Sequence, residues 1–289
     1  MAVSEIPRFL HMGDLDAPRT AALLELAAVM KHHPLAWRDT LDGRAIACIY
    51  GGPSTRSRVS IQVAVHRLGA FPVMLSPEEM QLGRGEAATD TARVLSAYCD
   101  AIVAHTVQHR EVLDLADFAS IPVIDARACQ TLADCLTLRM RFGDLHGFPL
   151  AYIGRCGDVA HGLIEAAVLT GMTLRIATPR SGLADPGLLF RAGQTVRLFD
   201  DPRDAVAGAL AVYTDATSDP DANFRVTARL MELAAVDAVF MHPLPAHRGD
   251  EVESCVIDSP ASAVWEQAAN LLPVEQALLR ALVTGDWEV

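Results

Sequence analysis

The sequence predicts an α/β protein of two similar domains, each a parallel sheet flanked by helices. Short apolar runs alternate along the chain with amphipathic stretches of helical periodicity. Strands that alternate with helices favour parallel sheets with right-handed crossovers. The expected strands fall into two sets of four, and a chain of 289 residues is long enough for two hydrophobic cores.

Each element follows from its local pattern, in chain order. The segment 54–68 is typical of the helices, because its apolar side chains repeat along one face and Gly69 follows as a stop signal. The helix at 127–142 is expected to join the two domains. Strands are expected at 44–50, 71–75, 100–104, 121–124, 149–153, 173–177, 210–214 and 236–241. Helices are expected at 17–31, 54–68, 88–98, 109–119, 127–142, 158–170, 224–235 and 262–283.

Composition narrows the class of protein. A net charge of −12 argues against nucleic acid or an anionic membrane as the main partner. No apolar run is long enough to span a bilayer, and the N-terminus lacks a secretory signal, so we expect a cytoplasmic protein. Six scattered cysteines without a CxxC pair fit reduced thiols, and no metal-ligand spacing such as HExxH occurs. We therefore expect neither a metal nor another cofactor.

The turn after the strand at 44–50 is the best candidate for a binding site. Gly51 and Gly52 let the backbone turn tightly, and Pro53-Ser-Thr-Arg-Ser-Arg58 then opens a helix. Unpaired first-turn amides, hydroxyl groups and a bidentate arginine together suit a phosphate. The alternative is an ordinary capped helix with solvated arginines. Ligands of parallel α/β folds bind at the carboxyl ends of strands, where this turn lies.

Motifs along nearly the whole chain resemble the aspartate/ornithine carbamoyltransferase family, and more closely its ornithine branch. Ser54-Thr-Arg-Ser-Arg58 is similar to the carbamoyl-phosphate signature, usually Ser-Thr-Arg-Thr-Arg. The other matching stretches follow in family order. They are Gln81-Leu-Gly-Arg-Gly-Glu86, Asp90-Thr-Ala-Arg-Val-Leu-Ser96, Pro122-Val-Ile-Asp125, Cys129-Gln-Thr-Leu-Ala-Asp134, Tyr213-Thr-Asp215, Phe240-Met-His-Pro-Leu-Pro-Ala-His-Arg-Gly-Asp-Glu-Val252 and Ala263-Val-Trp-Glu-Gln-Ala268.

The resemblance implies transfer of a carbamoyl group from carbamoyl phosphate to an amine, without a metal, as in arginine biosynthesis. It implies a carbamoyl-phosphate domain at 1–133, an acceptor domain at 134–261, and a C-terminal helix, 262–289, that packs back on the first domain. Family members are usually homotrimers, in which Gln81 would enter a neighbouring subunit's site. The implied catalytic residues are Arg56, His105, Arg127, Gln130, Asp215 and His242. Substrate would also contact Ser54, Thr55, Ser57, Gln81, Asp158, Pro243 and Leu244.

The donor side departs from the family pattern at two positions. His105 stands where the family has an arginine, and Arg127 stands where it has a histidine. This exchange keeps one permanent cation and one imidazole near the ligand. Our hypothesis is that carbamoyl phosphate still binds; the alternative is independent drift in a dead site.

The acceptor side departs further. Asp158 replaces an asparagine of the ornithine branch, the loop after Asp215 is about a dozen residues shorter, and Pro243 replaces a cysteine. A carboxylate at Asp158 would repel the carboxylate of ornithine, and Asp158 together with Asp215 would favour a cation instead. We therefore expect poor turnover of ornithine, and a diamine or another cationic amine as acceptor. Asp158 could instead be only a helix N-cap. The alternative for the whole protein is a non-catalytic paralogue that acts as a binding or regulatory subunit.

Overall fold

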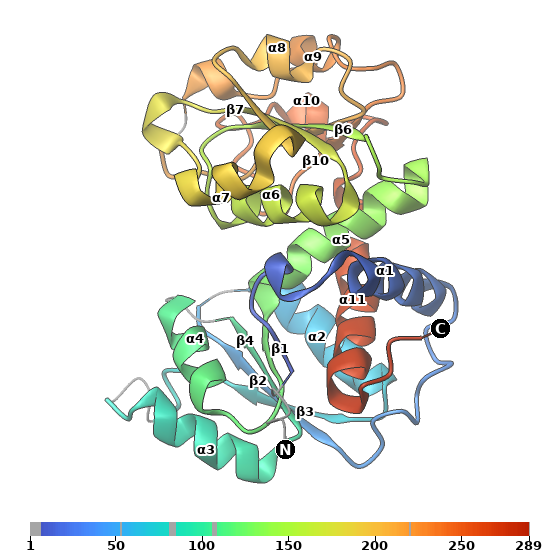
Figure 1. Ribbon diagram of the computed structural model, residues 1–289, viewed down its shortest axis with the longest axis vertical. Coiled ribbons are helices and arrows are strands. Elements are labelled where there is room, and N and C mark those ends of the chain that lie inside the picture. The colour runs from blue at the N-terminus through green and yellow to red at the C-terminus, as the bar shows by residue number, and fades with distance from the viewer. Residues whose placement is uncertain (1–6, 53, 81–84, 106–108, 220, 289) are drawn as a thin grey trace. The chain divides into compact units, whose positions relative to one another are not determined.

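The computed structural model describes residues 7–52, 54–80, 85–105, 109–219 and 221–288 (Figure 1). The chain divides into two compact units. The first unit comprises Met1–Leu132 and Leu271–Val289, and the second comprises Ala133–Asn270. No helix within these described ranges is long and apolar enough to cross a membrane.

The first unit contains a five-stranded parallel sheet in the order β1-β5-β4-β2-β3. Alternate residues of its strands are buried on opposite faces, as the two-residue period of a strand requires. Ala47 and Ile102, for example, pack with Val112 and Leu115 of the covering helices. The strands are Arg8–Phe9 (β1), Ala45–Tyr50 (β2), Phe71–Leu75 (β3), Ala101–His105 (β4) and Val123–Asp125 (β5). The helices are Ala17–His32 (α1), Thr55–Arg67 (α2), Ala88–Tyr98 (α3) and His109–Phe118 (α4).

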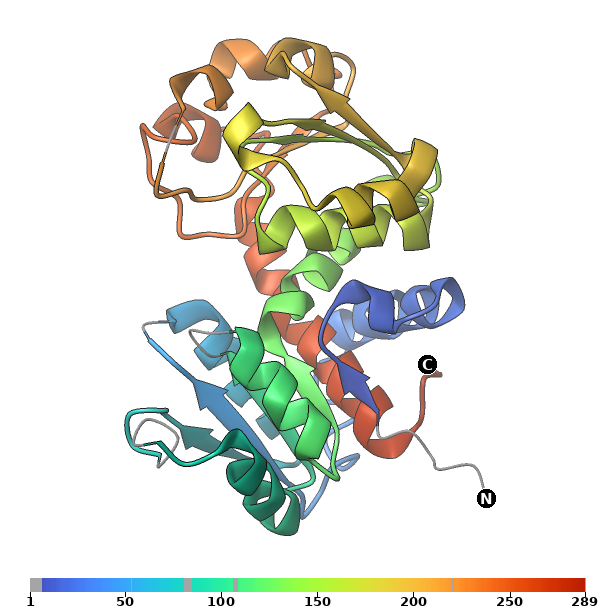
Figure 2. The ribbon, with the colours of Figure 1, turned by 60° about the vertical axis from the view of Figure 1, so that its left-hand side comes forward.

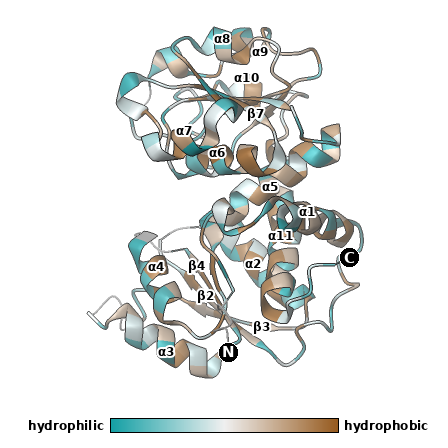
Figure 3. Cartoon of the chain, viewed as in Figure 1, coloured by the Kyte–Doolittle hydropathy of each residue, from teal (hydrophilic) through white to brown (hydrophobic). Residues whose placement is uncertain are grey.

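Helices cover both faces of this sheet. Figures 1 and 2 show α3 and α4 on one face and α2 on the other. Residues 46–50 of the central strand β2 are fully buried, and Figure 3 shows the strands of the sheet largely in hydrophobic colours. Strands buried on both faces are typical of doubly wound α/β folds, so the sequence pattern and the fold agree.

The second unit repeats this architecture with the strand order β10-β9-β6-β7-β8, again all parallel. The strands are Pro149–Ile153 (β6), Thr173–Ala177 (β7), Val196–Phe199 (β8), Ala211–Tyr213 (β9) and Val239–Met241 (β10). The helices are Asp158–Thr170 (α6), Pro186–Ala192 (α7), Pro202–Val206 (α8), Ala228–Met231 (α9) and Ser254–Ile257 (α10).

Two helices, α5 (Ala126–Phe142) and α11 (Val264–Thr284), have residues in both units. From Leu271 onward α11 belongs to the first unit, so the C-terminal helix packs back on the first domain as expected. The apolar side chains of this segment, such as Val274 and Leu278, are fully buried.

The predicted strands all occur, but each sheet has a fifth strand that the sequence pattern did not predict. One is the two-residue β1, too short to show a period. The other is β8, whose half-exposed residues include Arg197 and lack the apolar signal of a buried strand. The prediction of one helix over 224–235 is wrong. Only α9 forms there, and the Thr227 side chain caps its start by accepting a hydrogen bond from the Leu230 amide.

Candidate active site

The turn after β2 is built as the sequence predicts. The Gly51 amide donates to the carbonyl of His105 at 2.8 Å, which ties the turn to the end of β4. Gly52 has φ of 75°, in the region that favours glycine. Ser54 is the N-cap residue of α2, with extended backbone dihedral angles. Pro53, part of the predicted motif, lies outside the described residues.

The side chains of this turn differ in where they lie: four are at the start of α2, and Arg58 contacts the sheet. The Ser54 and Ser57 Oγ atoms lie 2.5 Å apart, and the Ser54 side chain does not cap the helix. Thr55 and Arg56 are exposed in the first turn, where the helix dipole favours an anion. Arg58 points back to the sheet instead, because its Nη2 donates to the Tyr50 carbonyl at 2.8 Å and its guanidinium lies over the Tyr50 ring.

His105 and Arg127 are brought together at the ends of adjacent strands. Asp125 ends β5 and is almost fully buried, and Arg127 binds it through Nη2 to Oδ2 at 2.9 Å and Nε to Oδ1 at 3.2 Å. Burial, and then the positive charge of Arg127, lowers the pKa of His105, while Asp125 opposes this shift. The imidazole is therefore neutral at pH 7. Its Nδ1 is buried and has no hydrogen-bond partner among the described residues.

Two neighbouring residues of α5 differ in character. Gln130 is half-buried on the helix that carries Arg127. Cys129 is fully buried, and burial raises the pKa of its thiol well above the ordinary value. A thiol held neutral in this way is a poor nucleophile, so Cys129 packs in the core rather than reacting.

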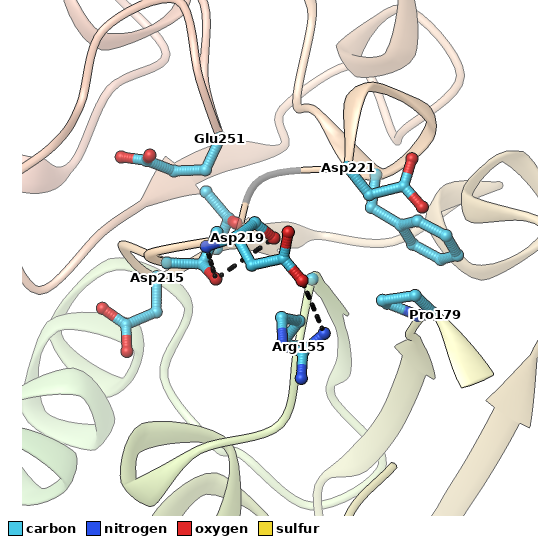
Figure 4. Close-up of a pocket in the computed structure, with 10 residues that line it drawn as sticks. Arg155, Pro179, Asp215, Asp219, Asp221 and Glu251 are labelled. Carbon is cyan, nitrogen blue, oxygen red and sulfur yellow. Dashed lines mark hydrogen bonds and ion pairs between the residues drawn. The ribbon is translucent and has the colours of Figure 1, made fainter. Parts of the chain in front are cut away.

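The second unit holds a small acidic cleft at the carboxyl ends of β6 and β9 (Figure 4). Asp215 and Glu251 are among its lining residues, and so is Arg155 of the loop after β6. The shortened segment after Asp215 also lines the cleft, through Thr217, Asp219 and Asp221. Among the charged residues described as lining the cleft, carboxylates therefore outnumber the arginine, which suits a ligand with positive charge.

Asp215 follows β9, and its surroundings raise the pKa of its carboxyl group. Burial raises its pKa to about 6, with further increases from the nearby Glu251 and Asp158 carboxylates, while a hydrogen bond from the Ala216 amide lowers it. Asp158 itself is exposed in the first turn of α6. The suggestion that Asp158 is the N-cap is wrong, because Gly157 occupies that position.

His242 lies in the interior of the second unit rather than on the cleft wall. Its ring is fully buried, and Nδ1 accepts a hydrogen bond from the Leu244 amide at 2.8 Å. The ring proton is then on Nε2, which lies 3.2 Å from Glu251 Oε1. Glu251 Oε2 is buried and accepts no hydrogen bond from the described residues. His242 therefore holds Glu251 in place at the cleft.

The turn at Pro243 and Leu244 has an unusual backbone. Leu244 has φ of 57°, and the peptide bond that joins it to Pro245 is cis. Pro243 is buried, and Leu244 packs partly against the core of the second unit. Gln81, the residue expected from a neighbouring subunit, lies outside the described residues.

Sequence reasoning missed several cleft residues. The sequence pattern does not single out Arg155, and Glu251 occurs there only inside the matching stretch that ends at Val252. Neither could be placed from sequence, because the cleft gathers them from loops about 100 positions apart. The sequence signal that could have indicated the cleft is the pair of acidic residues, Asp219 and Asp221, in the loop that follows β9.

Comparisons with known proteins identify the family of both halves of the chain. Residues 8–140 match the model of the aspartate/ornithine carbamoyltransferase carbamoyl-P binding domain, and residues 146–282 match that of the Asp/Orn binding domain. An ornithine carbamoyltransferase of Parasynechococcus marenigrum (strain WH8102) is 43% identical over 96% of this chain and 94% of its own length.

Solved structures give the same result. The ornithine carbamoyltransferase of Burkholderia thailandensis E264 superposes with a TM-score of 0.92 at 33% identity, covering 97% of this chain and 99% of that one. The enzyme of Pyrococcus furiosus gives 0.91 at 38% identity, covering 97% of both chains. The chain is a carbamoyltransferase of the ornithine carbamoyltransferase type, and it belongs to the aspartate/ornithine carbamoyltransferase family.

Proposed function

We propose that this enzyme transfers the carbamoyl group of carbamoyl phosphate to the δ-amine of L-ornithine, giving citrulline and phosphate. The observation that carries the acceptor half is the acidic cleft of the second unit. The named activity of its relatives supports the same acceptor. The earlier expectation of poor turnover on ornithine gains no support from these relatives, and we propose ordinary turnover instead.

The donor phosphate is proposed to bind at the start of α2. The hydroxyl groups of Ser54, Thr55 and Ser57 would donate to its oxygens, and Arg56 would bind it bidentately. The exposure of Thr55 and Arg56 at the helix start, and the absence of a side-chain cap from Ser54, support this assignment. Gln81 of a neighbouring subunit would complete the site in a homotrimer.

The carbonyl group is proposed to lie against His105, Arg127 and Gln130. A neutral imidazole can donate one N–H to the carbonyl oxygen, and Arg127 supplies positive charge where the oxyanion develops. The salt bridge to Asp125 fixes Arg127 in place, so this charge needs little reorganisation during the reaction.

The reaction balances without a cofactor. The neutral δ-amine attacks the carbonyl carbon, a C–N bond forms, and the C–O bond to phosphate breaks. Phosphate leaves with the electron pair of the broken bond and takes up the proton that the amine loses. Asp215 and Glu251 would hold the positive end of the acceptor, with His242 as a positioning residue and the Pro243 and Leu244 carbonyls as further acceptors.

A phosphate-release assay with a panel of amines tests the acceptor. We expect release with L-ornithine to exceed release with 1,4-diaminobutane, L-aspartate or no amine. If diaminobutane releases phosphate faster than ornithine, the diamine predicted from the sequence is the acceptor and the proposal is wrong.

The raised pKa of Asp215 predicts a particular pH dependence. With a pKa of about 6, Asp215 is mostly a carboxylate above that pH. As the pH falls through this value the side chain is protonated and no longer binds an ammonium ion. The reacting amine, with an ordinary pKa of about 10, already makes log kcat/KM rise with pH at a slope of one. At saturating carbamoyl phosphate, we expect the slope for ornithine to steepen below about pH 6 and the Asp215→Asn variant to lose this steepening.

We also propose a homotrimer in the cytoplasm, on the family pattern alone. Analytical ultracentrifugation of the purified chain measures the first point. A monomer with full activity would show that no neighbouring Gln81 is needed.

A further inference from the structure

Arg155 is the basic residue among those described as lining the acidic cleft of the second unit. It lies in the loop that follows β6, and Figure 4 shows it close to Asp219 with Asp215 to one side. A cleft walled only by carboxylates would attract a diamine and repel an amino acid. One guanidinium among them changes this preference, because an amino acid presents both charges to the protein.

The backbone and stem of Arg155 are held from two sides. The Tyr152 hydroxyl donates to the Arg155 carbonyl at 2.7 Å. On the other side the stem lies against Gly182, where an added Cβ would approach the Arg155 Cγ to 2.9 Å and its Cα to 3.1 Å. The amide of Cys156 also donates to the Gly182 carbonyl at 2.8 Å. The loop therefore fixes where this side chain begins.

The guanidinium is only partly satisfied within the described residues. Nη1 donates to Ser181 Oγ at 2.9 Å and to Asp219 Oδ2 at 3.4 Å, and Nη2 donates to the Ser181 carbonyl at 3.0 Å. A guanidinium has five N–H groups, so the Nε–H and one Nη2–H remain. These two groups form one edge of the guanidinium, the parallel pair that binds a carboxylate bidentately.

The pairing with Asp219 is weak and exchangeable. The distance of 3.4 Å is long for a charged hydrogen bond, and the Asp219 side chain is 81% exposed. An exposed ion pair contributes little, so a ligand carboxylate can replace Asp219 at small cost. Asp215 is half-buried and Glu251 is buried, and both carboxylates line the cleft where a positively charged group of the ligand can bind them.

We propose that Arg155 binds the α-carboxylate of the acceptor amino acid, while Asp215 and Glu251 bind its ammonium group. Arg155 then determines specificity: it makes the cleft a site for an amino acid rather than for a diamine. This inference rests on the proposed carbamoylation of ornithine.

The test compares Arg155→Gln with the native enzyme on two acceptors that differ only in the carboxylate, L-ornithine and 1,4-diaminobutane. Loss of two charge-assisted hydrogen bonds should raise KM for ornithine by about a hundredfold or more. KM or the inhibition constant for diaminobutane should change by less than about twofold, because that ligand makes no such bond. Arg155→Lys should recover part of the loss, since it keeps the charge without the fork.

Arg180→Gln is the matched control, because it removes an exposed arginine from the adjacent loop that is not among the cleft-lining residues. It should leave both acceptors unchanged. A loss of equal size on both acceptors in Arg155→Gln, or an unchanged KM for ornithine, overturns the inference.

A binding measurement separates this inference from the proposed function. L-norvaline keeps the α-amino acid group of ornithine but has no δ-amine, so its binding does not require turnover. With a phosphonate analogue of carbamoyl phosphate present, calorimetry should show norvaline binding to the native protein and about a hundredfold weaker binding, or more, to Arg155→Gln. Equal binding, or none to the native protein, contradicts the role of Arg155. Absence of citrulline with norvaline binding intact would contradict only the proposed reaction.

Discussion

Replacing Arg56 with glutamine is expected to lower kcat/KM for carbamoyl phosphate by about a thousandfold, the largest effect on activity that the site predicts. Arg56 lies in the first turn of α2, next to the Ser54 and Ser57 hydroxyl groups. A bidentate guanidinium–phosphate contact comprises two charge-assisted hydrogen bonds, each with a free energy of about 1.5–3 kcal/mol. Steady-state kinetics at saturating ornithine measures the change.

Arg67→Gln is the control for this experiment. Arg67 ends the same helix, so its replacement changes the charge of α2 without touching the turn. We expect kcat/KM to stay within about twofold of the native value, since a surface charge at the helix C-terminus affects stability only slightly. Equal losses in Arg56→Gln and Arg67→Gln would show that the helix start is not the phosphate site.

Replacing Asp134 with alanine is expected to destabilise the second unit by about 2–5 kcal/mol, the largest effect on stability. Asp134 is fully buried and accepts hydrogen bonds from the Tyr213 hydroxyl at 2.9 Å and from Gln267 Nε2 at 2.7 Å. Gln267 Oε1 in turn accepts from the His242 amide at 2.9 Å. The substitution leaves buried donors unpaired on β9 and α11, and each costs its desolvation free energy.

Urea denaturation measures this change as a shift of the unfolding midpoint. Asp258→Ala is the control, because Asp258 binds Arg248 on the surface, where an ion pair contributes little. We expect the midpoint of Asp258→Ala to stay close to that of the native protein. Similar midpoints for Asp134→Ala and Asp258→Ala would mean that the buried network does not stabilise the unit.

The regular part of the fold could be predicted because its signal is local. Buried parallel strands such as β2 read as continuous apolar runs, and α2 shows its period within four turns. The elements that were missed or misplaced have no such signal. The edge strand β8 is half-exposed, and α9 is a single capped turn where 224–235 was expected to be one helix.

The donor half of the site was predictable for the same reason. Ser54 to Ser57 are consecutive in sequence, so one turn brings them together. The acceptor half was not, because Arg155, Asp215 and Glu251 come from three separate loops. Charges read from sequence alone suggested a diamine site. The positive charge of Arg155 belongs to the cleft only because the fold places this residue beside the carboxylates, which the sequence pattern does not reveal.

Formation of citrulline shows whether this enzyme carbamoylates ornithine. Purified enzyme is incubated with isotopically labelled carbamoyl phosphate and L-ornithine, and labelled citrulline is measured by mass spectrometry against a sample without enzyme. We expect citrulline in proportion to the amount of native enzyme, and about a thousandfold slower formation with Arg56→Gln at carbamoyl phosphate concentrations well below KM. No citrulline above background from correctly folded native enzyme would contradict the proposed carbamoylation of ornithine.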